Sequence, residues 1–151
     1  MPIRMELLEQ LKREHKEVQD LLEKAEATGE GAEKTREQLA DKLKEKLLPH
    51  SKAEEKVLYE RLADEEESRD LIAEAKDEHQ EDEQLLKELL STETDAPEWI
   101  QTLKKLRDAV AHHVQEEEDE IFVKAESLIN PEEMDELLLL YREEKERFTA
   151  L

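Results

Sequence analysis

Two segments of the chain carry histidine and glutamate at a spacing suited to metal binding. They read HSKAEEKVLY from His50 and HVQEEEDEIF from His113, and in each a glutamate follows four residues after the histidine, Glu54 and Glu117. Residues four apart project from the same side of an α-helix. Each segment therefore predicts an imidazole beside a carboxylate, a pair of donors that can ligate a cation.

A second pair of histidines repeats in the same way. The segments EHKEVQDLL and EHQEDEQLL contain His15 and His79, which precede His50 and His113 by 35 and 34 residues. This regularity indicates a tandem duplication of one helical hairpin, with histidine on the first helix and HxxxE on the second. Two such hairpins that close on each other would bring together six side chains: His15, His50, Glu54, His79, His113 and Glu117.

Composition favours a single all-α domain spanning residues 1–151. Charged residues make up 44% of the chain and aromatic residues 3%, with only two glycines, which is typical of long solvated helices. The net charge of −21 argues against a nucleic-acid partner, because an acidic surface repels phosphates. Anionic membrane surfaces are disfavoured for the same reason.

Other features bear on compartment. The sequence has no cysteine, which excludes a thiolate metal site and a disulfide framework. Its first residues, MPIRMELLEQ, lack the apolar core of a signal peptide, and no apolar run is long enough to span a membrane. A cytoplasmic protein is expected.

Apolar residues recur every three or four positions in four segments, which predicts four long helices. These are followed by a short fifth helix. The core bundle is expected at about residues 3–127 and the C-terminal helix at about 131–149. Four consecutive leucines, Leu137 to Leu140, are more than one helical stripe requires, which makes a homodimer contact a hypothesis beside the monomer.

The histidines and the paired glutamates lie on the apolar stripes, so the sequence predicts that they are buried. Each uncompensated ionisable group costs several kcal/mol on burial, and a domain with a total stability of about 5–15 kcal/mol cannot absorb six such costs. Metal ions would remove them. Imidazole and carboxylate donors without sulfur suit Fe, Mn or Zn, and two carboxylates that can bridge favour a pair of ions. The ExxH motif of ferritin-like proteins is absent, since no glutamate lies three residues before any histidine.

The order H, HxxxE, H, HxxxE over about residues 5–125 resembles the HHE cation-binding, hemerythrin-like domains. The resemblance implies an up-down four-helix bundle that holds two Fe ions in an oxo- or hydroxo-bridged di-iron centre. It implies that Glu54 and Glu117 are bridging carboxylates. The chemistry of the family is binding of dioxygen, nitric oxide or peroxide and, in several branches, iron or oxygen sensing.

The chain departs from the oxygen-carrying hemerythrins at two positions. Ala75 stands where they have a further histidine, and Glu118 occupies the place of their fourth-helix aspartate, which makes it the alternative to Glu117. With four histidines the centre is either more open or completed by water, Glu83 or Asp82. A more open and more anionic centre favours ferric iron, which argues for peroxide or nitric oxide chemistry over reversible oxygen carriage.

Four nearby residues have other expected roles. His112 is expected on the outer face. Tyr59 and Phe122 follow their histidines by nine residues, about 180° around a regular helix, so we expect them to pack between helices. Pro49 should kink its helix, either to curve it around the core or to aim His50.

The function expected from the sequence is that of a non-haem di-iron protein that binds or reduces dioxygen, nitric oxide or peroxide. Any enzymatic activity would be redox chemistry directed at peroxide or nitric oxide, and Zn or Mn are possible substitutes for iron. The alternative is an iron- or oxygen-sensing module without turnover. A third hypothesis, a structural bundle with incidental histidines, predicts that metal has no effect on stability.

Overall fold

The computed structural model describes residues 6–149, and within them the chain is helical with no strand. Two long helices are single α-helices, α1 (Glu6–Glu26) and α4 (Arg69–Ser91). Two others are continuous rods with a π-helical turn inside, and a last helix completes the chain. Their bounds are α2 (Glu33–Glu54), η1 (Glu55–Tyr59) and α3 (Glu60–Ala63), then α5 (Pro97–Glu116), η2 (Glu117–Ile121) and α6 (Phe122–Leu128), then α7 (Pro131–Thr149).

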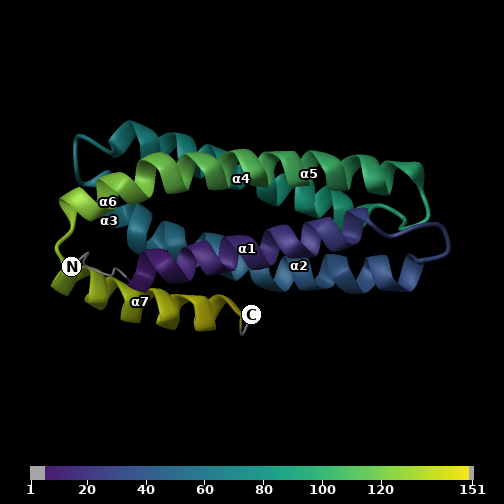
Figure 1. Cartoon of the computed structure of the whole chain (residues 1–151), viewed down its shortest axis with the longest axis horizontal. Coiled ribbons are helices and arrows are strands. Elements are labelled where there is room, and N and C mark those ends of the chain that lie inside the picture. Colours follow the sequence, from purple (N-terminus) through teal and green to yellow (C-terminus); the bar gives the residue numbers. More distant parts are fainter. Residues whose placement is uncertain (1–5, 150–151) are drawn as a thin grey trace.

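The four long rods form an up-down bundle, as the sequence predicted. In Figure 1 they lie lengthwise beside one another, and the loops that join α1 to α2 and α4 to α5 lie at the same end. Helix α1 contacts α2 and α5, while α4 contacts the same two helices. The four helices thus enclose one interior in the cyclic order α1, α2, α4, α5.

Polar side chains interrupt the apolar interior near its middle. One apolar cluster lies toward α3, α6 and α7 and includes Leu11, Leu58 and Phe122. The other lies toward the loops at the opposite end and includes Leu43 and Leu103. Between them lie the buried histidines and glutamates, so the two clusters exclude water from the polar layer on both sides.

The π-helical turns begin directly after Glu54 and at Glu117. A π turn closes i→i+5 hydrogen bonds and is wider than an α turn, so each residue advances the chain by a smaller rotation. Tyr59 and Phe122 were expected to pack between helices, and their place in the apolar core confirms this prediction. Both side chains are turned inward, with 0% and 1% of their surface exposed.

Helix α7 packs along α1 and α2. Met134, Leu137, Leu138 and Tyr141 are buried against the bundle, whereas Leu139 and Leu140 are 62% and 49% exposed. The predicted homodimer contact would use these exposed leucines and stays a prediction. Among residues 6–149, no helix is long and apolar enough to cross a membrane.

Candidate metal centre

All six side chains predicted from the sequence meet in the middle of the bundle. The four histidines are 3–4% exposed, and Glu54 and Glu117 are fully buried. Each histidine directs its Nε2 atom toward one of the two carboxylates that lie between them. The Nε2-to-oxygen distances are His15–Glu117 3.1 Å, His50–Glu54 3.6 Å, His79–Glu54 3.4 Å and His113–Glu117 2.9 Å.

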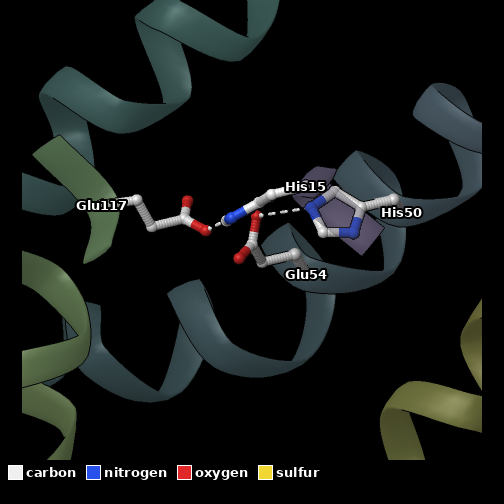
Figure 2. Close-up of side chains that lie close together, drawn as sticks. All are labelled: His15, His50, Glu54 and Glu117. Atoms are coloured by element: carbon white, nitrogen blue, oxygen red, sulfur yellow. Dashed lines mark ion pairs between the residues drawn. The ribbon is translucent and has the colours of Figure 1, made fainter. Parts of the chain in front are cut away.

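The six residues divide into two groups that share both carboxylates. One group joins His15 and His50 to Glu54 and Glu117, and Figure 2 shows these four side chains converging. The other joins His79 and His113 to the same two glutamates. In each group one ligand atom per residue lies within 4.8 Å of all the others, which is close enough to hold one ion. This arrangement offers two adjacent cation positions with two carboxylates able to bridge them.

An outer carboxylate faces the Nδ1 atom of every histidine in the centre. Each comes from the preceding rod of the bundle in the cyclic order. The carboxylate beside the α2 histidine lies on α1, the one beside the α4 histidine on η1, the one beside the α5 histidine on α4, and the one beside the α1 histidine on η2. The four pairs are Glu14–His50 at 2.8 Å, Glu55–His79 at 3.5 Å, Glu78–His113 at 3.5 Å and Glu118–His15 at 2.9 Å.

The outer carboxylates select the tautomer of the histidines. An imidazole that donates its Nδ1–H to a carboxylate keeps the Nε2 lone pair free for a metal ion, and this is the usual second shell of metal-bound histidine. The two 2.8–2.9 Å contacts are hydrogen bonds. Of the two contacts at 3.5 Å, His113–Glu78 also has hydrogen-bond geometry, whereas His79 Nδ1 is within ion-pair distance only.

Three of these glutamates, Glu14, Glu55 and Glu78, were not predicted as site residues, and Glu118 was expected only as the alternative to Glu117, although a signal was present. Each is the chain neighbour of a predicted ligand, in the doublets Glu14-His15, Glu54-Glu55, Glu78-His79 and Glu117-Glu118. Glu118, the alternative ligand to Glu117, binds His15 from outside, and Glu117 lies inside.

The structure also distinguishes between Glu83 and Asp82, the two residues expected to complete the coordination. Glu83 turns outward, where it pairs with Lys52 at 3.1 Å. Asp82 is 3% exposed, its Oδ1 has no hydrogen-bond partner among the described residues, and it lines the same small cavity as the four histidines. Burial raises the pKa of Asp82 to about 6. His112 is exposed, as expected, and pairs with Glu78 and Glu116.

Unpartnered polar atoms concentrate at the centre. Within residues 6–149, His15 Nε2, both oxygens of Glu54 and Glu117 Oε1 are buried without a hydrogen-bond partner. Each such atom costs about 1–3 kcal/mol. Each of these atoms faces the space between the two groups and offers a lone pair there once it is deprotonated, so the donor set fits metal ions.

The two glutamates have opposite electrostatic tendencies. Burial and the charge of Glu117 raise the pKa of Glu54 well above its usual value. Burial also disfavours the Glu117 anion, but hydrogen bonds with Glu54, His113 and His15 outweigh burial and lower the pKa of Glu117. Without metal, the pair therefore carries a proton on Glu54 and a charge on Glu117.

The histidines of one group also differ. Burial disfavours the charged form of His15, yet its contacts with the carboxylates of Glu117, at 3.1 Å, and Glu118, at 2.9 Å, raise the pKa of His15 to about 10. Burial lowers the pKa of His50 to about 4. The metal-free centre thus uses a protonated His15 to offset the Glu117 charge, a role that a cation can replace.

The hydroxyl of Tyr59 also reaches the centre and donates a hydrogen bond to Glu117. Phe122, at the matching position of the second repeat, stacks on His15 with ring centroids 5.9 Å apart. The aromatic side chains of the two halves of the centre therefore differ by one hydroxyl group.

Comparison with known proteins gives one match. A family model, described as the hemerythrin HHE cation binding domain, matches residues 6–125. No curated protein and no solved structure matches the chain. The matched segment runs from the start of α1 into α6, so it contains all six residues of the centre and leaves out α7.

The metal-free protein should be stabilised by the substitution Glu54→Gln at pH 7. Folding there requires Glu54 to take up a proton, because its pKa is raised above the usual 4.5. Glutamine needs none and can still donate to Glu117. We expect the free energy of unfolding to rise at pH 7, and the gain to vanish as the pH falls to about 4.5, where the unfolded chain also protonates Glu54.

Urea denaturation of metal-free wild type and variant across this pH range would measure the effect. Glu45→Gln, at an exposed position of the same helix, is the matched control and should change little. If the Glu54→Gln protein is less stable than wild type at pH 7, then Glu54 is not the protonated member of the pair and Glu117 is not the charged one.

Proposed function

Because the chain belongs to the hemerythrin HHE cation-binding domain family, we propose that its buried histidines and glutamates hold two iron ions. The proposed ligands are His15 and His50 for one ion and His79 and His113 for the other, with Glu54 and Glu117 shared between them. We propose that this di-iron protein binds or reduces a small oxidant, namely dioxygen, nitric oxide or peroxide.

The observation that carries the proposal is the convergence of four imidazole Nε2 atoms on two buried carboxylates, with a carboxylate at every Nδ1. In a purely structural bundle, four histidines whose Nε2 atoms point inward would contribute no stability, because these atoms would face buried carboxylates without a cation between them. Burying these groups without a cation would remove much of the stability of a domain this size. Metal binding compensates that cost, because it supplies the positive charge that the centre lacks.

Iron is the proposed metal on two grounds. The family binds cations through this motif. Nitrogen and oxygen donors without sulfur also suit a redox-active first-row ion, and bridging carboxylates stabilise its ferric state. Zn and Mn accept the same donors and are the expected substitutes where iron is scarce.

The cavity beside the centre favours a small ligand. Its volume is about 10 Å³, which is about the room that one water-sized molecule needs. Apolar side chains of Val18, Leu47, Val110 and Val114 line it and exclude bulk water. Asp82 is the acidic side chain there, and its unpartnered Oδ1 is placed to hold a proton near a bound molecule. Bound iron would supply the redox chemistry.

The alternative function, iron or oxygen sensing without turnover, is favoured by one contact network. Glu14, the hydrogen-bond partner of His50, also accepts a hydrogen bond from Tyr141 and pairs with Lys145 at 2.7 Å. Both of these residues lie on α7. A shift of His50 on metal binding would therefore reach α7 through a single carboxylate.

Metal analysis tests the proposal. Protein purified from iron-supplemented cells is expected to hold about two Fe ions per chain and to show near-ultraviolet bands of a bridged ferric pair. Both should be lost in Glu54→Ala and Glu117→Ala but kept in the exposed control Glu45→Ala. Consumption of added peroxide would favour turnover. A steep rise of the melting temperature with iron, without peroxide consumption, would favour sensing.

The proposal fails if wild type retains no Fe, Mn or Zn after anaerobic reconstitution. A melting temperature that does not respond to any of these metals would support the structural hypothesis instead.

The outer carboxylates give a second, independent prediction. Glu14→Gln replaces the anion that orients His50 and leaves the volume unchanged, so we expect metal affinity to fall about 10–100-fold. Glu17→Gln is the matched control, since Glu17 is exposed on the same helix and pairs with a surface lysine, Lys46. Competition with a chromophoric chelator measures both. Equal affinities would show that the Glu14 contact does not support the centre.

A further inference from the structure

The hydroxyl oxygen of Tyr59 lies among donor atoms of one half of the centre. It is 3.4 Å from His79 Nε2, 3.4 Å from His113 Nε2 and in hydrogen-bond contact with Glu117 Oε2. Tyr59 is fully buried, so its hydroxyl finds its polar partners within the centre.

The distances that involve the two histidine nitrogens are close to those of ligands around one ion. Two donors that bind an ion at about 2.1 Å and at right angles lie about 3.0 Å apart. His79 Nε2 and His113 Nε2 are 2.8 Å apart, and His113 Nε2 is 2.9 Å from Glu117 Oε2. The phenol oxygen, at 3.4 Å from both nitrogens, is only slightly farther away.

The other half of the centre lacks this oxygen. The ring of Tyr59 stacks on His79 with centroids 5.1 Å apart, as the ring of Phe122 stacks on His15. Both aromatic residues follow the HxxxE histidine of their repeat by nine residues. A π-helical turn lies between the histidine and the end of each segment, beginning directly after Glu54 in the first repeat and at Glu117 in the second. The π-helical turn of the first repeat therefore places a donor atom, the Tyr59 oxygen, beside one group of ligands. The turn of the second repeat places the hydrocarbon ring of Phe122 beside the other.

We infer that Tyr59 is a further metal ligand, which binds through its phenolate oxygen the ion held by His79 and His113. The inference rests on the proposed function. On metal binding the O–H bond of Tyr59 breaks, its proton is released to solvent, and the oxygen lone pair binds the ion. The two ions are then unequal: the ion at His15 and His50 has one protein donor fewer and keeps a position for an external ligand.

The visible spectrum of the ferric protein tests this directly. A phenolate bound to Fe(III) gives a charge-transfer band in the visible region, which neither a histidine nor a carboxylate ligand produces. The chain has two tyrosines, so the band can be assigned by substitution. Tyr59→Phe removes only the hydroxyl and should abolish the band. Tyr141→Phe is the matched control, because Tyr141 contacts Glu14 and the outer Nδ1 of His50, and should keep it.

Iron content is measured on the same samples, and affinity is followed with Co(II), which needs no oxidation. We expect Tyr59→Phe to lower the affinity for one of the two Co(II) ions by at least about tenfold, since loss of a side chain that only hydrogen-bonds to a ligand already lowers metal affinity by that much. Wild type with two irons and no visible band, or Tyr59→Phe with an unchanged band, would overturn the role of Tyr59 and leave the proposed function standing. Wild type without iron would overturn both.

Discussion

The burial of six ionisable side chains in one layer of the bundle is the constraint on which the rest of the structure depends. Such a layer is stable only where each group has a compensating partner. The structure supplies partners outside the layer, as a carboxylate at the Nδ1 atom of every histidine. Inside the layer, four atoms still have no hydrogen-bond partner among the described residues: His15 Nε2, both carboxylate oxygens of Glu54 and Glu117 Oε1. The compensation is thus complete only with cations present, which ties the fold to metal loading.

The architecture follows from that layer. Two hairpins of similar sequence place one histidine per helix at the same level, and the cyclic order of the helices lets each supply the acid that orients the histidine of the next. The π-helical turns after Glu54 and at Glu117 then bring a ring over each half of the centre. Helix α7 lies outside the repeat but contacts Glu14 through Tyr141 and Lys145, so it too is joined to the centre.

Most of this could be predicted from the sequence. The 3.6-residue period gave the helices, the duplication gave the hairpins, and the HxxxE spacing identified the residues that the structure brings together. Partners between helices could not be predicted, because the pairing of Glu14 with His50 or Glu118 with His15 depends on the order of the helices around the bundle. The contact of the Tyr59 hydroxyl with Glu117 could not be predicted either, since a π turn has no sequence pattern that distinguishes it from an α turn and changes the direction in which the residues after it project.

Anomalous diffraction at the iron absorption edge, from crystals of the iron-loaded protein, tests the central claim most directly. The account predicts two peaks in the middle of the bundle, one between the Nε2 atoms of His15 and His50 and one between those of His79 and His113, with Glu54 and Glu117 in contact with both. Three other side chains, Glu78, His112 and Glu116, also lie close enough together to hold an ion. A single peak at these residues, or no peak in the buried layer, would contradict the account.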